Sequence, residues 1–330
     1  MSARSCSASP TDVSQDGVAI RHDGLTLSPR PPYPPHVADD TPDSTPADGV
    51  LTTRPFPADR LSVVDLIRTG TLDVELAATL WLLVEARVPL VVAAADHRSG
   101  KSTVLAALLD FVPPGTRLVG LAGADETFEW LPQASDLGWP GVARPGTVPQ
   151  AVRPDTTILL ADELSEHQPT DTWGAAARVA VRAASIGYGL AATMHADSLD
   201  GVFEALRPPP VRLADDELSH LGVVLVMRRV DGDRRRLVAA HYVRPVARDT
   251  HGHIQRLGPA VLATWDPSTD SFEHFAWGIT PELAMRVGRR AGDFEIEVGR
   301  RRDVLDAMVA AGMTGPDDVR RAILAYRPAV

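Results

Sequence analysis

Lysine is almost absent from this chain. The 330 residues include 33 basic side chains, and all but one of these are arginine, so Lys101 is the only lysine. A lysine ammonium is a compact point charge on a flexible stem, which the planar guanidinium of arginine does not reproduce. A position that keeps lysine in such an arginine-rich sequence is therefore a candidate for chemistry that needs an ammonium group.

Cysteine and long apolar runs are also scarce. The single cysteine, Cys6, excludes an intramolecular disulfide and a cysteine-based metal cluster. No apolar run approaches the ~18 residues that a membrane-spanning helix needs. Residues 1–10 contain no apolar segment of the kind found in a secretory signal. We therefore expect a cytoplasmic protein.

Positive charge is not in excess. The chain has 43 acidic and 33 basic residues, a formal net charge of −10 and a pI of about 5.4. Affinity for nucleic acid requires a basic surface that displaces counterions, so we expect no nucleic-acid partner. The one basic run, Arg234-Arg235-Arg236, is explained more simply as a solvated hairpin than as a DNA-binding patch.

Composition divides the chain into three parts. Residues 1–54 are rich in proline, serine, aspartate and glycine without sustained periodicity, which predicts a disordered tail. Residues 55–277 are predicted to form an α/β domain with a hairpin extension. Residues 278–330 are predicted to form a small C-terminal helical subdomain.

Within the α/β domain, short apolar runs alternate with helical patterns, which predicts a parallel sheet with helices on both faces. A short helix ending at Gly70 and a longer amphipathic helix at 71–84 come first. The expected strands lie at 88–95, 118–121, 156–161 and 189–193, and further helices at 102–111 and 173–185. After residue 220 the pattern changes to hairpins, at 223–230 with 237–243 and at 260–265 with 272–277. Helices are then expected at 281–290, 295–311 and 317–325.

A phosphate-binding loop follows the first of these strands. Residues 95–102 match the pattern G-x-x-x-x-G-K-[ST] except that Ala95 replaces the first glycine, which we expect to weaken nucleotide affinity. Backbone N–H groups and the dipole of the following helix would surround a phosphate there. Lys101 would reach the β- and γ-phosphates, and Ser102 would bind Mg²⁺. The fold class is therefore a P-loop NTPase of the RecA-like type, and its predicted phosphate-binding residues are Ala95, Ser99, Gly100, Lys101, Ser102 and Thr103.

A second strand ends in two carboxylates. The apolar run at 156–161 is followed by Asp162 and Glu163, about 60 residues after Lys101. In P-loop enzymes such a strand is expected to lie beside the strand that carries the phosphate loop. Its acids hold the Mg²⁺ shell and orient the attacking water, which assigns Asp162 to the metal and Glu163 to the water.

Further motifs follow a recognisable order along the chain. The segments 54–56 and 66–72 precede the phosphate loop, and Asp125-Glu126-Thr127-Phe128-Glu129-Trp130 follows it as an acidic box. Arg153-Pro154-Asp155 precedes the acidic strand, and Ala192-Thr193-Met194-His195-Ala196-Asp197-Ser198 is similar to a histidine box. On these motifs, residues 55–327 resemble the type II/type IV secretion ATPase superfamily, and within it the archaeal-type and tight-adherence pilus ATPases.

The resemblance implies an ATPase that uses ATP and Mg²⁺. It implies that His195 senses the γ-phosphate, that Glu126 assists Glu163, and that Arg144 or Arg153 acts across a subunit boundary. It also implies a homo-oligomer, expected to be a hexamer, or a mixed ring. Such a ring would work at the cytoplasmic face of a membrane with the inner-membrane platform protein of a secretion or pilus complex.

Departures from the family pattern leave an alternative open. Ser165 stands where the family has an arginine, and the tail at 1–54 occupies the place of the large N-terminal domain. Arginines stabilise the transition-state charge of the γ-phosphoryl group, so slow hydrolysis is expected. The alternative is a degenerate, non-catalytic nucleotide-binding subunit that regulates such a complex. A third interpretation, a DNA-handling P-loop motor, is disfavoured by the acidic charge.

Overall fold

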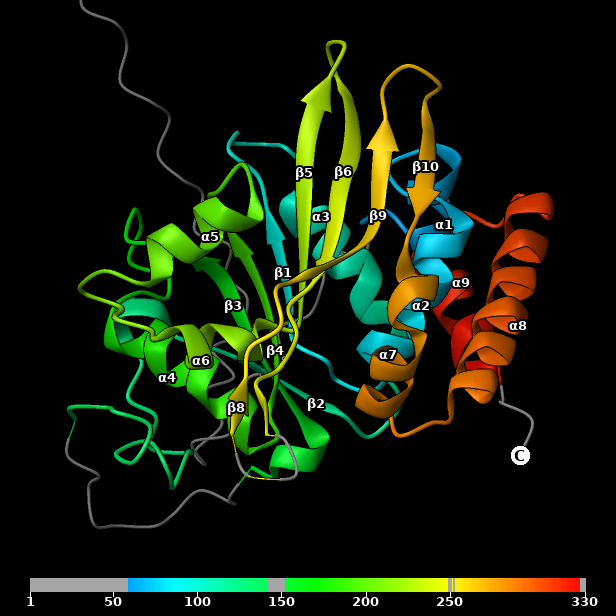
Figure 1. The fold of residues 1–330 in the computed structure, drawn as a ribbon. Coiled ribbons are helices and arrows are strands. Elements are labelled where there is room, and N and C mark those ends of the chain that lie inside the picture. Colours follow the sequence, from blue (N-terminus) through cyan, green and yellow to red (C-terminus); the bar gives the residue numbers. More distant parts are fainter. Residues whose placement is uncertain (1–58, 142–151, 249–250, 252, 327–330) are drawn as a thin grey trace, which may run out of the picture. The chain divides into compact units, whose positions relative to one another are not determined.

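The computed structural model describes residues 59–141, 152–248, 251 and 253–326. The predicted tail at 1–54 and Arg144 lie outside these residues. The described chain is built on an eight-stranded sheet with the strand order β10-β9-β6-β5-β1-β4-β3-β2 (Figure 1). A short separate ribbon is formed by β7 (Ala247–Arg248) and β8 (Ile254–Gln255).

Five strands of the large sheet are parallel and three are antiparallel. The parallel strands are β1 (Leu90–Ala93), β2 (Arg117–Gly120), β3 (Thr157–Leu164), β4 (Gly189–Met194) and β5 (Val223–Val230). The antiparallel strands are β6 (Arg234–Tyr242), β9 (Ala260–Asp266) and β10 (Ser271–His274). The predicted α/β fold, a parallel sheet continued by hairpins, is confirmed. The hairpins extend the same sheet because the first half of β5 is apolar and buried, and it pairs in parallel with β1.

The order of the central strands corrects one prediction. β4, not the acidic strand β3, lies beside β1. β1 therefore has β4 on one side and β5 on the other, and β3 is the next strand but one. The strand that leads to His195 is thus inserted between the phosphate-loop strand and the strand that carries Asp162 and Glu163. A short acidic side chain at the end of β3 has to reach past β4 to meet the phosphate loop.

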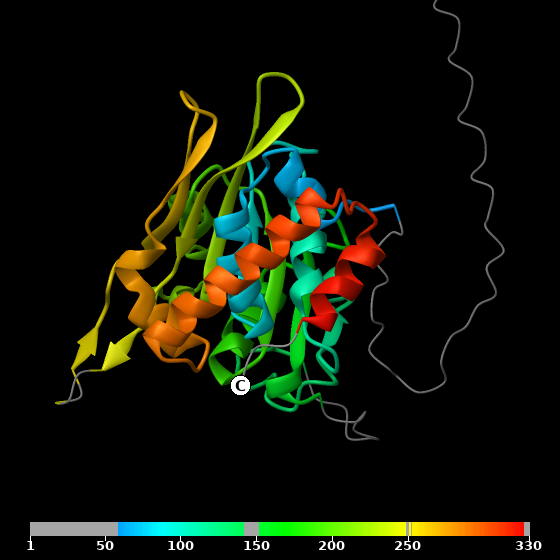
Figure 2. The same ribbon diagram turned by 90° about the vertical axis from the view of Figure 1, so that its right-hand side faces the viewer.

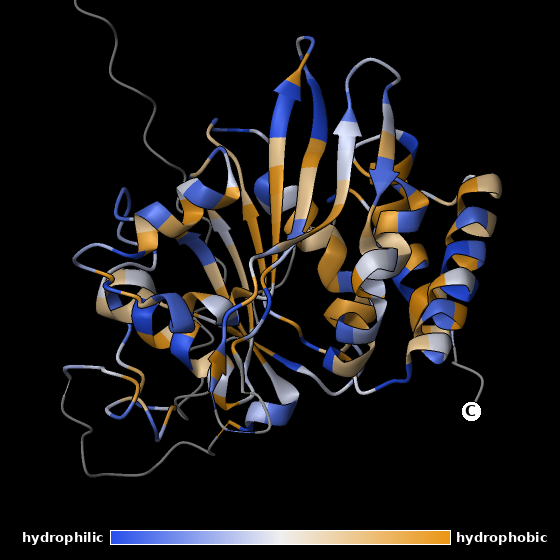
Figure 3. Ribbon diagram, in the orientation of Figure 1, coloured by the Kyte–Doolittle hydropathy of each residue, from blue (hydrophilic) through white to orange (hydrophobic). Residues whose placement is uncertain are grey.

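Helices cover both faces of the sheet, as predicted. One face packs against α1 (Val63–Arg68), α2 (Val74–Glu85), α3 (Lys101–Leu108), α7 (Thr280–Arg286), α8 (Ala291–Ala310) and α9 (Pro316–Ala325), several of which lie in front of the sheet in Figure 2. The other face packs against α4 (Ala175–Ala183), α5 (Leu199–Leu206), α6 (Asp215–Leu218) and the segment 121–139. Figure 3 shows that the central strands are hydrophobic and the tip of the β5–β6 hairpin is hydrophilic.

Two local predictions were wrong. The helix expected to be amphipathic, α2, has nine consecutive buried residues, 76–84, because it is packed on one side by the sheet and on another by α8. The last hairpin strand, expected to reach residue 277, ends at His274. Trp277 lies in a 3₁₀ turn (Ala276–Ile279) and is 77% exposed. No helix among the described residues combines the length and the apolar character that crossing a bilayer requires.

A buried arginine joins α8 to α2. Arg301 is 0% exposed and forms ion pairs with Glu85 of α2 and with Glu297, which is 2% exposed, one turn earlier in α8. Its guanidinium lies 5.0 Å from the ring centroid of Trp81 and 5.5 Å from that of Tyr326. One buried carboxylate, one partly exposed carboxylate and two aromatic faces thus hold one cation between the helices.

This arrangement predicts a large effect of substitution. Arg301→Ala would leave Glu297 buried with less compensation, and breaking a buried ion pair costs about 3–5 kcal/mol. We expect the free energy of unfolding, measured by urea titration, to fall by that amount. Arg302→Ala is the matched control because this neighbour is 46% exposed and its ion pair with Glu75 lies at the surface; it should lower stability by less than about 1 kcal/mol. Equal effects of the two variants would contradict the prediction.

Candidate functional site

The predicted phosphate loop connects β1 to α3 at the carboxyl edge of the parallel strands. Residues 95–98 are exposed, Ser99 is buried, and Gly100 is the N-cap of α3 with a left-handed φ of +94°. The left-handed backbone favours glycine here, and a Cβ at Gly100 would also displace the Arg235 side chain, because it would lie 2.9 Å from the Arg235 Cδ atom. The loop therefore turns directly into a helix whose first residue is Lys101.

Ala95, at the start of the loop, does not have the backbone strain that was expected for an alanine in place of glycine. Ala95 is not among the described residues with a positive φ, so its backbone conformation does not need glycine. The loop uses the left-handed region at Arg98 instead, with a φ of +60°. Asp96 is exposed, which leaves its carboxylate in contact with solvent. The physical reason for expecting weakened affinity at Ala95 is thus not found in its backbone conformation.

Three predicted residues from three separate segments converge beside this loop. Nζ of Lys101 lies 3.4 Å from Oε1 of Glu163, and Nε2 of His195 lies 3.0 Å from the same oxygen. Lys101 is 7% exposed, and the side chains of Glu163 and His195 are 22% and 17% exposed. One carboxylate oxygen therefore contacts both the only lysine and the predicted sensor histidine, inside a half-buried space.

A bulge in β3 places the acid there. Between Ala161 and Leu164 the register of β3 against β4 shifts, so that β3 has an extra residue around Asp162 and Glu163. A bulge re-aims side chains, which explains how an acid on the next strand but one reaches Lys101. The backbone is fixed on both sides: Thr172 donates its N–H to the carbonyl of Glu163 at 2.8 Å, and the hydroxyl of Thr193 donates to the carbonyl of Asp162 at 2.5 Å.

His195 links the acidic strand to the phosphate loop. Its Nε2 faces Glu163, and its Nδ1 lies 3.3 Å from the carbonyl oxygen of Ala95. His195 therefore lies between two oxygen atoms, and its contact with Oε1 of Glu163 is a close approach without hydrogen-bond geometry. A change of charge at the loop or at Glu163 would therefore alter which of the two contacts the histidine keeps.

Two further histidines, which sequence reasoning did not select, lie beside His195. The ring of His97, in the phosphate loop, is 4.4 Å from that of His195, and the ring of His167, after β3, is 5.6 Å away. The sequence signal was present: each histidine follows the carboxyl end of a parallel strand, close to the motif residues. Among the described residues, no group of three histidine, cysteine, aspartate or glutamate side chains is arranged to hold a metal ion.

The loop offers features that fit a phosphate ligand. The hydroxyl of Ser99 is buried without a hydrogen-bond partner among the described residues, and a buried polar group without a partner is costly. Ser102, in the first turn of α3, is exposed, and Thr103 is half-buried. Hydroxyls and helix N–H groups beside a buried ammonium fit the oxygens of a phosphate chain. The Ser102 hydroxyl and the Asp162 carboxylate, predicted to hold Mg²⁺, have the hard oxygen atoms that this ion prefers.

Glu126 makes its hydrogen bonds within its own loop. It is 7% exposed, and both of its carboxylate oxygens accept hydrogen bonds from its own loop. Oε2 accepts from the N–H of Ala122, and Oε1 from the N–H of Thr127, the N–H of Phe128 and Nε1 of Trp130. No described contact joins it to Lys101, Glu163 or His195. The structure thus gives Glu126 the geometry of a residue that organises its loop.

This geometry makes a testable prediction. In Glu126→Gln one carboxylate oxygen becomes an NH₂ group, which necessarily faces an N–H donor because both oxygens are occupied. Hydrogen bonds to charged groups contribute about 1.5–3 kcal/mol, and we expect the free energy of unfolding to fall by that amount. Urea titration measures it, with Glu129→Gln, an exposed acid of the same box, as the control. Unchanged stability combined with lost hydrolysis would instead assign Glu126 to the reaction.

The remaining predicted residues are not joined to this cluster. Arg153 is 73% exposed and pairs with Asp155 through Nε and Nη2, at 3.1 and 2.6 Å. Arg144 lies outside the described residues. Ser165, which stands where the resembling family has an arginine, is 5% exposed and donates its hydroxyl to Asp171, whose carboxylate also accepts hydrogen bonds from the backbone N–H groups of His167 and Gln168. The hydrogen bond between Ser165 and Asp171 therefore stabilises the turn after β3.

The basic run at 234–236 forms one side of a hairpin, but its three arginines have different roles. Arg236 is 5% exposed, contrary to the expectation of a solvated side chain, and together with Arg234 it pairs with Asp270. The hydrogen bonds from Arg236 lower the pKa of Asp270 to about 2, so this carboxylate stays charged above that pH. Arg235 instead donates Nε to the carbonyl of Arg98, in the phosphate loop, at 3.2 Å.

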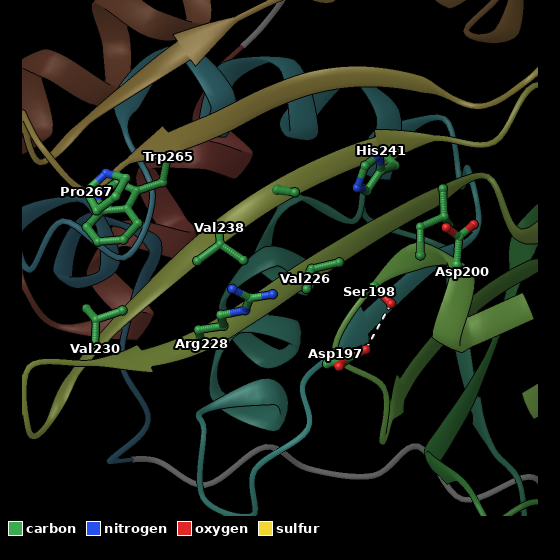
Figure 4. A pocket seen from close by; sticks show the side chains of 12 residues that line it. Asp197, Ser198, Asp200, Val226, Arg228, Val230, Val238, His241, Trp265 and Pro267 are labelled. Carbon is green, nitrogen blue, oxygen red and sulfur yellow. Dashed lines mark hydrogen bonds between the residues drawn. The ribbon is translucent and has the colours of Figure 1, made fainter. Parts of the chain in front are cut away.

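A hollow of about 520 Å³ lies beside the β5–β6 hairpin (Figure 4). Asp197 and Ser198, which follow the histidine box, line one side of it, and the strands β5, β6 and β9 line the other. Arg228 of β5 belongs to this hollow. Because Met227 and Arg228 are consecutive in a strand, they point to opposite faces, and Arg228 points away from the side that Met227 occupies.

Comparison with known proteins gives distant similarities. No protein-family model matches the chain. It is 24% identical over 304 residues to the uncharacterized protein MJ0900 of Methanocaldococcus jannaschii, over 86% of the chain and 52% of that protein, so it spans about half the length of this relative. It is 25% identical over 224 residues to the uncharacterized protein MJ1287 of the same organism, over 63% of the chain and 77% of that protein.

Two solved structures are also similar. The VirB11 ATPase of the Brucella suis type IV secretion system, in complex with sulphate, has a TM-score of 0.35 and 22% identity over 55% of this chain and 54% of that one. The ATPase DotB of Legionella pneumophila has a TM-score of 0.26 and 12% identity over 74% and 62%. At this level of similarity the function has to be argued from the geometry of the site.

Proposed function

We propose that this chain binds and hydrolyses ATP as a motor subunit of a type II/type IV secretion or pilus-assembly machine. One observation carries the proposal. The only lysine, the acid at the end of β3 and the histidine after β4 meet within 3.4 Å at one carboxylate oxygen, beside a loop that turns through a left-handed glycine into a helix. These are the parts that ATP hydrolysis requires, brought together from three separate segments.

The binding step follows from the charges at the loop. The Lys101 ammonium and the N–H groups at the start of α3 attract and orient the phosphates. The buried hydroxyl of Ser99 is available to donate to a phosphate oxygen. Phosphate oxygens near Lys101 compete with Glu163 for the ammonium, which frees the Glu163 carboxylate from one of its two contacts. ATP binding thus leaves the Glu163 carboxylate free to orient a water molecule.

The hydrolytic step depends on that carboxylate. Glu163 orients a water molecule and accepts its proton as the water oxygen bonds to the γ-phosphorus atom, while the bond from that atom to the bridging oxygen of the β-phosphate breaks and ADP leaves. His195 contacts both Glu163 and the carbonyl of Ala95. When Glu163 takes up the proton from water, His195 loses its contact with the Glu163 carboxylate. The histidine thereby couples the protonation of Glu163 to the phosphate loop. A magnesium ion held by Ser102 and Asp162 would supply the positive charge that phosphoryl transfer needs.

The proposal includes the assembly of the chain into a ring. We place the chain in a homohexamer or mixed ring at the cytoplasmic face of a membrane, docked on the platform protein of a secretion or pilus complex. Arg153 is 73% exposed and bound only to a neighbouring surface acid among the described residues, so it is available to a neighbouring subunit. Arg153 or Arg144 would then act on the nucleotide of the next subunit, and no nucleic acid takes part.

A second candidate function is a non-catalytic regulatory subunit of such a ring. The observation that favours it is the hydrogen bond from Ser165 to Asp171, which uses for a turn the position where the resembling family has an arginine. A site that lacks this cation can still bind nucleotide, but its transition state is less well stabilised. The two functions differ in turnover and not in binding.

The test uses the purified full-length chain at concentrations that permit oligomers. We expect ATP to bind, as measured by isothermal titration calorimetry, and phosphate to be released slowly in the presence of Mg²⁺ and not after chelation with EDTA. Binding without turnover at every protein concentration would favour the regulatory subunit. Absence of ATP binding would contradict both functions.

A further inference from the structure

One histidine of the phosphate loop has no role in the proposed function so far. His97 is exposed, and in the described part of the chain its ring contacts one other ring, that of His195, with the centroids 4.4 Å apart and the planes inclined by 65°. Its nitrogen atoms form no hydrogen bond or ion pair with the described residues. A neutral imidazole carries one N–H donor and one acceptor. His97 can therefore offer a hydrogen-bond donor to a ligand of the loop.

The backbone on both sides of His97 is held in place. The carbonyl oxygen of Ala95 lies 3.3 Å from Nδ1 of His195, and the carbonyl of Arg98 accepts a hydrogen bond from Nε of Arg235 at 3.2 Å. These contacts fix the loop two residues before His97 and one residue after it. The His97 side chain thus starts from a fixed backbone, which lowers the entropy that is lost when it contacts a ligand.

The neighbours of His97 show which end of a bound phosphate chain it would meet. In the proposed reaction Glu163 orients the water that attacks the γ-phosphorus atom, and Nε2 of His195 lies 3.0 Å from the Glu163 carboxylate. His97 contacts that same histidine, so its ring lies on the side of the loop where the γ-phosphate would react. The N–H groups that would hold the phosphates shared by ATP and ADP belong to the start of α3, at Lys101, four residues later.

The charges at this end of the loop favour an additional donor. Nζ of Lys101 lies 3.4 Å from Glu163, so part of the lysine charge is already balanced by the protein. Asp96, next to His97, is a second acid, and a γ-phosphate brings further negative charge. A hydrogen bond to a charged acceptor is stronger than one between neutral groups. An imidazole N–H directed at the γ-phosphate therefore adds affinity for ATP that ADP does not gain.

We propose that His97 donates a hydrogen bond to the γ-phosphate and thereby distinguishes ATP from ADP. The proposal rests on the proposed nucleotide binding, and it adds a side chain that the pattern G-x-x-x-x-G-K-[ST] does not specify. With ADP in the loop there is no γ-phosphate, and His97 keeps its edge contact with His195. A hydrogen bond that only ATP receives is lost on hydrolysis, which favours the release of ADP.

The test compares two nucleotides that differ by the γ-phosphate. The dissociation constants of Mg-ATP and Mg-ADP are measured by isothermal titration calorimetry for the full-length chain and its variants. His97→Phe keeps a flat ring beside His195 and removes the N–H donor. We expect this variant to bind ATP about tenfold more weakly and ADP with unchanged affinity, which also shows that the loop is still folded. His97→Gln returns an N–H donor and should keep the ATP affinity within about threefold of that of the unmodified chain.

The matched control is His253→Phe, the same substitution at an exposed histidine that directly precedes β8, outside the phosphate loop. It should leave both constants unchanged. An equal loss of ATP and ADP affinity in His97→Phe, or no loss of either, would overturn the role of His97 while nucleotide binding stands. A His97→Gln variant that binds ATP as weakly as His97→Phe would overturn it as well. Binding of neither nucleotide by the unmodified chain would contradict the proposed function itself, and the role of His97 with it.

Discussion

Replacing Lys101 by methionine is expected to weaken ATP binding by about 100-fold or more. Methionine keeps an unbranched stem in a position that is 7% exposed, so the change removes the charge with little loss of packing. Removing one partner of a buried, hydrogen-bonded charge pair costs about 2–5 kcal/mol, which corresponds to a factor of roughly 30 to several thousand in affinity. Isothermal titration with Mg-ATP measures the effect.

A second variant, Lys101→Arg, tests whether the charge alone is sufficient. It restores the charge with the side chain that the chain uses at its 32 other basic positions, but a guanidinium is broader and cannot act as a point charge. We expect at least about a tenfold loss, and Arg228→Met, a charge removal outside the loop, should have no effect. Full affinity in Lys101→Arg would show that the single lysine is not required by the chemistry of the site.

Glu163→Gln is expected to separate turnover from binding. The amide keeps the shape and one acceptor oxygen, but it cannot take a proton from water at neutral pH. Loss of a general base costs about 10²–10⁴ in rate, so phosphate release should fall by that factor. ATP affinity should not fall by more than about threefold, because the charge that is removed has the same sign as the charge of the phosphates.

The control for this variant is Glu166→Gln, three residues later in the turn after β3 and exposed. It should leave both phosphate release and ATP affinity unchanged. A Glu163→Gln variant that retains full turnover would remove Glu163 from the reaction, and one that loses affinity would assign it to the positioning of Lys101. Circular dichroism of each variant shows whether the fold is retained.

Much of the fold could be predicted because the central strands each contain a continuous apolar run and turn residues separate the helices from the strands. The buried run at 157–161 and the glycine and lysine of the phosphate loop illustrate this. The position of β4 between β1 and β3 could not be predicted, because strand order is set by how the connections pack and not by any local pattern. The position of β5 beside β1 could not be predicted for the same reason.

The site was predictable as a set of residues and not as a geometry. Lys101, Glu163 and His195 were selected from motifs, but their meeting at one oxygen depends on the bulge in β3, which has no sequence signature of its own here. The role of Glu126 in its loop depends on four donors that only the fold brings together. The contact of Arg235 with the phosphate loop spans 137 positions, beyond the reach of any local pattern.

The two strands that end the large sheet, β2 and β10, are each only four residues long. An outermost strand presents unpaired backbone groups on which another chain can add a strand, and shortness reduces that risk. β10 is also tied down at its end, since Nε2 of His274 lies 2.7 Å from Oδ2 of Asp73 at the start of α2. In the proposed ring, where copies of the chain would be crowded together, aggregation by strand addition would therefore be disfavoured.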